Sequence, residues 1–116
     1  MNNVVLFSRH EPVFDEYQTP AEKCIDGQPT QRTWHHFTSE DEKFFSGTWE
    51  AEPGCWRVDY TENEFCQILG GHSILRDACG NEMDLKAGDK LVIPVGFKGE
   101  WQVVETTKKI YVIYEP

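Results

Sequence analysis

Glu64-Phe-Cys-Gln-Ile-Leu-Gly-Gly71 is the first of two informative stretches, and Gly88-Asp-Lys-Leu-Val-Ile-Pro-Val-Gly96 follows it after sixteen residues. Each pairs a short strand-like run with turn residues. Gly71 allows the chain to pass from one hairpin arm to the next, because glycine tolerates conformations that other residues avoid. Pro94 suits the end of a strand, where no backbone N–H has to be donated. Both stretches therefore predict β-strands bounded by tight turns.

The same pattern continues on both sides of these stretches. Short runs rich in Val, Ile, Trp, Tyr and Phe are separated by turn signals, which is typical of strands. Residues 39–45 are the exception, because Ser39 and Glu42 have capping-box spacing and predict one helical turn. Many short strands without helices indicate an all-β sandwich, jelly roll or small barrel. The predicted strands are 33–37, 44–51, 55–61, 64–69, 72–76, 82–85, 90–93, 99–105 and 108–114.

Composition limits the classes of function. The 116 residues fit one domain, and the net charge of −9 disfavours nucleic acid and anionic membranes as partners. No apolar stretch reaches the 18 residues of a membrane span, and the N-terminus does not resemble a signal peptide. We therefore expect a cytoplasmic protein with reduced thiols at Cys24, Cys55, Cys66 and Cys79.

Residues 1–30 differ from residues 31–116. They contain three of the six prolines, and only Val4–Phe7 has the composition of a strand. We interpret them as an N-terminal arm on a single domain formed by residues 31–116. An unpaired sheet edge invites a further strand, so we expect the arm to add to a sheet in a two-fold homodimer. A mobile tail on a monomer is the alternative.

The two stretches together resemble the two conserved motifs of the cupin superfamily, including the usual length between them. Further segments between residues 44 and 114, among them Gly47-Thr-Trp-Glu50 and Gly96-Phe-Lys-Gly99, resemble single-domain cupins named for the cupin domain of (S)-ureidoglycine aminohydrolase. The resemblance implies a cupin jelly-roll β-barrel.

The resemblance also shows what has changed at the metal site. A metal-binding cupin has three histidines and a glutamate at positions that correspond here to Arg57, Asp59, Glu64 and Gly99. Only the glutamate remains, and an arginine beside two carboxylates is a poor ligand set for a transition metal. The mixed Glu, His and Gln set of the aminohydrolase is also missing. We therefore expect neither a transition metal nor another cofactor. The alternative left open is an oxygen-preferring ion held weakly by Asp59 and Glu64.

The resemblance places the inward faces of the barrel strands. Side chains two residues apart on a strand share a face, so Arg57 pairs with Asp59, and Glu64 pairs with Cys66. With Trp101 as an apolar wall, these five residues form the predicted pocket. We expect Arg57 to meet Glu64 inside the barrel, and a desolvated Glu64 is the candidate acid or base. The alternative is a purely structural buried ion network.

Several other residues have simpler interpretations. His35 and His36 are adjacent, so their rings should point to opposite faces, and both are interpreted as surface histidines. Cys66, beside carboxylates, is expected to be a small core residue rather than a nucleophile. Lys108 and Lys109 are interpreted as protection against edge pairing.

The preferred function is recognition, with or without turnover, of a small polar metabolite such as a ureide or a carboxylate in a metal-free pocket. One alternative is a metal-dependent ureide hydrolase, which the family name suggests. Another is a non-catalytic structural or interaction module, which predicts a sealed barrel without an accessible cavity.

Overall fold

A computed structural model describes residues 3–116 of the chain. These residues form nine strands and one short 3-10 helix, joined by tight turns. The elements are β1 (Val13–Gln18), η1 (Ala21–Lys23), β2 (Cys24–Asp26), β3 (Thr30–Thr38), β4 (Phe44–Ala51), β5 (Gly54–Asp59), β6 (Asn63–Asp77), β7 (Glu82–Lys86), β8 (Lys90–Ile93) and β9 (Lys98–Tyr114).

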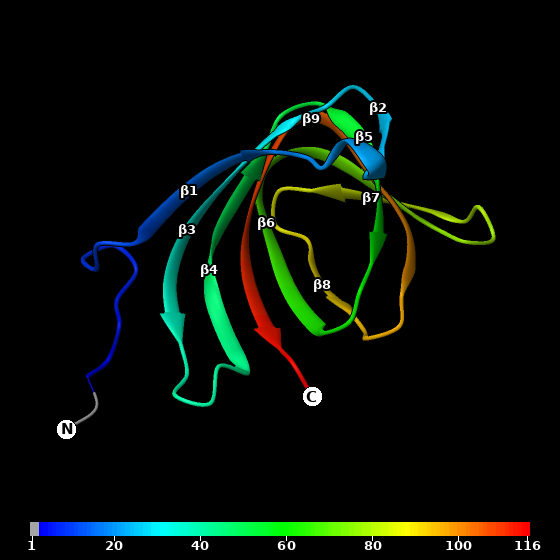
Figure 1. Cartoon of the computed structure of the whole chain (residues 1–116). Helices are drawn as coiled ribbons and strands as arrows, with labels where there is room; N and C mark the ends of the chain where they lie inside the picture. The colour runs from blue at the N-terminus through cyan, green and yellow to red at the C-terminus, as the bar shows by residue number, and fades with distance from the viewer. Residues whose placement is uncertain (1–2) are drawn as a thin grey trace.

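The strands belong to one antiparallel sheet that curls around a common interior (Figure 1). Its main path runs β1-β3-β4-β9-β5-β2, and β6 pairs with β7, β8 and β9. The 17-residue strand β9 is central, because it pairs with β4, β5 and β6 along its length. The predicted all-β jelly roll is confirmed.

Two long strands replace four shorter predicted ones. Residues 64–69 and 72–76 are both part of β6, and residues 99–105 and 108–114 are both part of β9. The pairing register between β6 and β9 shifts at several points from Ile68 to Ser73. Such irregularities let β6 bend there while it stays paired with β9. Gly71 has a φ of 87°, and a Cβ there would clash with the Thr106 carbonyl. Glycine is therefore required where β6 bends over β9.

The helical turn predicted for residues 39–45 is wrong. The segment is a tight connection between β3 and β4, in which the Phe44 N–H donates to Ser39 Oγ at 3.0 Å. Ser39 Oγ in turn donates to Asp41 Oδ1 at 2.6 Å. Glu42 has a φ of 58°, which no helix accommodates. The last two residues of the predicted turn, Phe44 and Phe45, belong to β4, and Phe45 pairs with Thr38 of β3.

The strand predicted at Val4–Phe7 is also wrong. These residues have no ladder partner, and Phe7 instead stacks on the His36 ring with centroids 4.2 Å apart. The strand of this region is β1, whose exposed side chains gave little apolar signal. It exists because its backbone pairs with the edge of β3 from Val13 to Gln18. The first two residues of the predicted arm lie outside the described residues.

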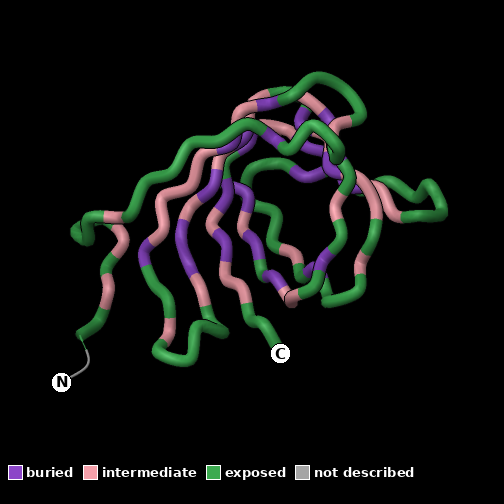
Figure 2. Tube along the Cα trace, in the orientation of Figure 1, coloured by how far each residue is buried: buried purple, intermediate pink, exposed green. Residues whose placement is uncertain are grey.

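The hydrophobic core lies on the inner face of the sheet. Figure 2 shows the buried residues concentrated along the middle strands, whereas most loops are exposed. Trp49, Trp56 and Trp101 form its aromatic centre, and Trp101 is 1% exposed. Within residues 3–116, no helix is long and apolar enough to cross a membrane. The core fills only part of the interior, and the rest is a cavity.

Candidate functional site

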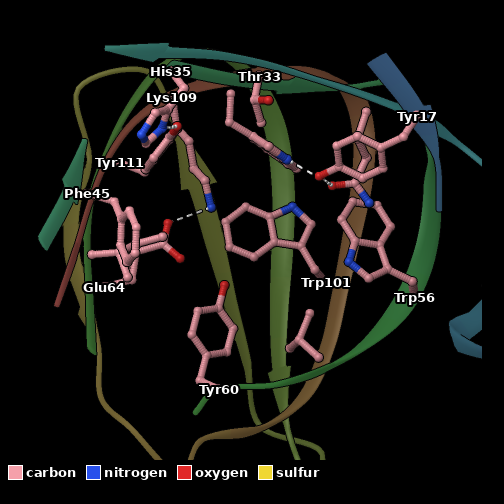
Figure 3. A pocket seen from close by; sticks show the side chains of 14 residues that line it. Tyr17, Thr33, His35, Phe45, Trp56, Tyr60, Glu64, Trp101, Lys109 and Tyr111 are labelled. Atoms are coloured by element: carbon pink, nitrogen blue, oxygen red, sulfur yellow. Dashed lines mark hydrogen bonds and ion pairs between the residues drawn. The ribbon is translucent and has the colours of Figure 1, made fainter. Parts of the chain in front are cut away.

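A cavity of about 360 Å³ opens beside the tryptophan core (Figure 3). Residues of β1, β3, β4, β5, β6 and β9 line it, together with Tyr60, which follows β5. Figure 3 shows Lys109 and Glu64 on one side, Tyr17 and Trp56 on the opposite side, and Trp101 between them. The cavity is therefore polar at two ends and aromatic in the middle.

An ion pair between Lys109 and Glu64 is its most distinctive feature. Lys109 Nζ lies 2.9 Å from Glu64 Oε2, and the two side chains are only 7% and 6% exposed. The ammonium also lies over the rings of Trp49 and Trp101, 4.5 Å and 4.4 Å from their centroids. Such contacts stabilise a desolvated cation. The charge is thus held by one carboxylate and two aromatic faces.

The protonation states of this cluster follow from its surroundings. Burial alone would lower the pKa of Lys109, but the Glu64 carboxylate together with Tyr60 and Cys66 outweighs burial and holds that pKa above its ordinary value. Lys109 is therefore a permanent cation and not a nucleophilic amine. Burial raises the pKa of Cys66 to about 12, and this thiol donates to Glu64 Oε2 at 2.9 Å. Cys66 is fully buried, as expected, and its lack of reactivity stays a prediction.

A second polar group in the cavity is the Tyr111 hydroxyl. Its oxygen lies 2.7 Å from His35 Nδ1, and His35 Nε2 lies 2.6 Å from Thr38 Oγ1. Burial raises the pKa of Tyr111 to about 12, so the phenol keeps its proton. The cavity thus contains a hydroxyl that is hydrogen-bonded to an imidazole, and both nitrogens of this imidazole have a hydrogen-bond partner.

The opposite end of the cavity is built around Gln31. Its Oε1 accepts from Tyr17 Oη at 3.1 Å and from Trp49 Nε1 at 2.9 Å. Its Nε2 donates to Thr19 Oγ1 at 2.9 Å. Because an indole N–H can only donate, this arrangement fixes the orientation of the amide. Tyr17 belongs to β1, so the N-terminal segment contributes directly to the cavity wall.

The structure brings only part of the predicted pocket together. Glu64 and Trp101 line the cavity, and the buried Cys66 thiol donates to Glu64 without being part of the cavity wall. Arg57 and Asp59 are exposed, and Arg57 Nη1 donates to the Glu22 carbonyl oxygen at 3.4 Å. A separate hollow is lined by both residues together with Tyr60 and Glu64.

The predicted contact between Arg57 and Glu64 is therefore wrong. Their neighbours Trp56 and Val58 point into the cavity, so the alternation of β5 directs Arg57 and Asp59 outward. The inward-facing positions predicted for β5 are therefore shifted by one residue from those in the structure. The apolar–polar alternation of Trp56-Arg-Val-Asp59 was the signal that favoured the correct phase.

Lys109 is the functional residue that the sequence interpretation missed. It was interpreted as protection for an edge strand, but β9 lies in the middle of the sheet and Lys109 is buried. Its even spacing from Tyr111 and Ile113 indicated in the sequence that Lys109 points inward with them, since alternate residues of a strand share a face. His35 and His36 do point to opposite faces, but His35 lines the cavity and His36 is 9% exposed, so neither is an ordinary surface histidine.

The donors in the cavity do not fit the divalent metal that many cupins hold. Within residues 3–116, no three His, Cys, Asp or Glu side chains are grouped as metal ligands. Among the residues that the structure describes, Glu64 is the only acidic side chain in the cavity wall, and its carboxylate is already neutralised by Lys109. A second cation beside the ammonium would be repelled.

Comparisons with known proteins agree with this architecture. The EutQ-like cupin domain profile matches residues 38–111. The EutQ protein of Clostridium difficile has a similar structure, with a TM-score of 0.69 at 17% identity over 92% of this chain and 97% of that one. A protein of unknown function from Pseudomonas syringae, of the DUF861 family, has a TM-score of 0.79 at 16% identity over 87% of this chain. This chain covers only 44% of the length of the Pseudomonas protein.

A DUF861 family protein from Thermotoga maritima is 31% identical over 55% of this chain and 73% of that one, with a TM-score of 0.54. No curated protein is similar enough to this chain to count as a match. The comparisons support the cupin fold but not the narrower resemblance to ureidoglycine aminohydrolase. Because the matched profile spans most of the chain, the protein belongs to the EutQ-like cupin domain family.

Proposed function

We propose that this protein binds a small polar metabolite in the cavity, with a neutral ureide or amide group at the Lys109–Glu64 pair. The observation that carries the proposal is this buried pair at the wall of an accessible cavity. Desolvating two charges is costly, and a structural pair gains little over apolar residues. A pair exposed to an aromatic cavity, by contrast, offers a donor and an acceptor to a ligand.

The balance of charge favours a neutral group over a carboxylate. Lys109 attracts an anion, but Glu64 lies 2.9 Å from the same ammonium and repels it. A ureide contains a carbonyl oxygen that accepts from Lys109 and an N–H that donates to Glu64. It satisfies both partners without adding charge. Of the two ligand classes expected from the sequence, the ureide is therefore the better match.

The walls of the cavity favour a small, flat ligand. A volume of about 360 Å³ lies near the lower end of ligand pockets, which span roughly 300–1,000 Å³. Trp49, Trp56 and Trp101 provide ring faces on which a planar group can pack. An accessible cavity also disfavours the sealed barrel of a purely structural module, and the donor set disfavours a metal-dependent hydrolase.

Calorimetric titration of the full chain tests this proposal. The probes are hydantoin, a cyclic ureide, and N-methylurea, with acetate as a carboxylate of similar size. We expect the ureides to bind and acetate to bind more than tenfold more weakly. The variant Lys109→Met should lose ureide binding, whereas Lys108→Met, which changes an exposed neighbour on the opposite face, should retain it.

A folding control separates binding from stability. Lys109→Met leaves a buried carboxylate unpaired, so the double variant Glu64→Gln, Lys109→Met removes both charges and should fold. It too should fail to bind ureides. Equal ureide affinity in the wild type and the folded double variant, or tight binding of acetate alone, contradicts the proposal.

A further inference from the structure

His35 is engaged through both of its ring nitrogens. Nδ1 lies 2.7 Å from the Tyr111 hydroxyl inside the cavity, and Nε2 lies 2.6 Å from the exposed Thr38 hydroxyl. A neutral imidazole carries one proton, so one nitrogen donates and the other accepts. The choice between the two forms decides what the Tyr111 hydroxyl presents to a ligand.

The two forms have opposite consequences. With the proton on Nδ1, His35 donates to the Tyr111 oxygen, and the hydroxyl proton of Tyr111 is free to point into the cavity. With the proton on Nε2, the Tyr111 hydroxyl donates to His35, and its oxygen can only accept from a ligand. Thr38 suits either form, because a rotating hydroxyl donates or accepts.

Gly47 holds the Tyr111 hydroxyl in this position. A Cβ at Gly47 would lie 2.5 Å from the Tyr111 hydroxyl oxygen and 2.5 Å from the Trp34 carbonyl oxygen. The phenol therefore packs directly over the backbone of β4, in space that only glycine leaves open. The Gly47 segment, singled out in the sequence for its resemblance to cupins, thus has a local role at the cavity.

We propose that His35 is a positioning residue that makes Tyr111 a hydrogen-bond donor to a carbonyl oxygen of the ligand. Tyr111 and Lys109 are two residues apart on β9 and both line the cavity, so their side chains share the same wall of it. Glu64, the acceptor, is on β6, which pairs with this part of β9. This inference rests on the proposed function and deepens it: the ligand carbonyl binds between Lys109 and Tyr111, and its N–H faces Glu64.

Affinities of matched variants provide the first test, with hydantoin as the probe. Tyr111→Phe should weaken binding by about fivefold to tenfold, because one hydrogen bond to the ligand is lost. His35→Leu should weaken it by a similar factor. His35→Asn should recover part of the loss, because its amide can donate near the position of Nδ1. His36→Leu, on the opposite face, should bind like the wild type.

The tautomer of His35 in the ligand complex provides the second test. A histidine with a purely structural role is not required to carry its proton on Nδ1 when the ligand is bound. Nitrogen-15 NMR of histidine-labelled protein distinguishes a protonated Nδ1 from a bare one. In the hydantoin complex we expect the proton on Nδ1 of His35. A complex with the proton on Nε2, or Tyr111→Phe binding hydantoin like the wild type, overturns the assignment.

The outcomes separate this inference from the proposed function. If hydantoin binds and depends on Lys109 but not on Tyr111 or His35, the inference fails and the proposed function stands. If neither ureide binds the wild type, both fail together. If binding depends on all three residues, with partial recovery in His35→Asn, both are supported.

Discussion

Lys108 and Lys109 are neighbours in the sequence but belong to different environments. Lys108 lies on the outer face of the sheet, exposed, with its ammonium 4.8 Å from the centre of the Trp34 ring. Lys109 points inward, between two tryptophans and against Glu64. The same side chain is therefore a solvated surface charge at one position and the centre of the candidate site at the next. The period of two along a strand, rather than residue type, determines the role.

The same contrast recurs on β3. His35 lines the cavity and bonds to Tyr111, whereas His36 faces outward and is covered by Phe7 and His10. Inner positions in this protein make hydrogen bonds that a ligand can share. Outer positions hold the N-terminal segment against the sheet. Adjacent residues therefore provide natural matched controls for the predictions that follow.

The largest expected difference is between the two lysines. Lys109→Met should destabilise the protein by about 3–5 kcal/mol, because it leaves the buried Glu64 carboxylate unpaired. Lys108→Met should change the free energy of unfolding by less than about 0.5 kcal/mol, as an exposed substitution. Urea denaturation measures both. The double variant Glu64→Gln, Lys109→Met should regain most of the loss, and a double variant as unstable as Lys109→Met would argue against the pairing.

Alanine substitutions at two adjacent glycines should differ almost as much in their effect on stability. Gly71→Ala forces a side chain into a left-handed conformation and against the Thr106 backbone, so it should cost about 3 kcal/mol. Gly70→Ala meets open space and should stay within about 0.5 kcal/mol of the wild type. Thermal unfolding of both variants checks the bend in β6. Equal melting temperatures would show that the bend tolerates a side chain.

His36 should make the stability of the protein sensitive to acid. Burial lowers the pKa of His36 from its ordinary 6.5, and the nearby His10 and His35 lower it further. The unfolded chain then binds more protons than the folded one, so stability falls as the pH drops below about 6.5. His36→Gln should flatten this part of the stability profile, measured by urea denaturation from pH 8 to pH 5. A profile unchanged by His36→Gln would place the acid sensitivity elsewhere.

A small effect on stability is also expected for Arg57. Arg57→Ala removes an exposed side chain whose contact is with the Glu22 carbonyl oxygen, so stability should change by less than about 1 kcal/mol. An inward Arg57 paired with Glu64 would instead cost about 3–5 kcal/mol. Chemical denaturation decides between the two. A large loss in Arg57→Ala would restore the pocket expected from the sequence.

The fold was predictable because strands and turns leave strong local signals. Gly88, Pro94 and Gly96 mark real turns, whereas Gly70 and Gly71 mark a bend within β6, and β4 and β8 have the predicted bounds. β1 could not be found in this way, because its stability comes from backbone pairing with β3 rather than from apolar side chains. Long-range pairing also merged four predicted strands into β6 and β9.

The site was predictable only where the strand phase was correct. Glu64, Cys66 and Trp101 were assigned to the right face, whereas the positions of lost metal ligands drew Arg57 and Asp59 to the wrong one. Lys109 was missed because a lysine pair ordinarily signals an exposed strand. Its burial depends on Glu64, 45 positions earlier in the chain, on Trp49 of β4 and on Trp101 near the start of β9. No local pattern encodes that combination.

The homodimer expected from the sequence stays a prediction. Light scattering on the full chain tests it, and a monomer at tens of micromolar would contradict it. The N-terminal strand β1 pairs with β3 of its own chain, and Tyr17 on that strand reaches the cavity. A dimer is therefore expected to use the remaining outer face of the sheet rather than an exchanged arm.

The most direct test of the central claim is a crystal structure of the protein with hydantoin. We predict the ligand inside the cavity, with a carbonyl oxygen within hydrogen-bond distance of Lys109 Nζ and a ring N–H directed at Glu64. A ligand bound outside, near Arg57 and Asp59, or an empty cavity at saturating hydantoin, would contradict the claim that the inward face of β9 forms the binding site.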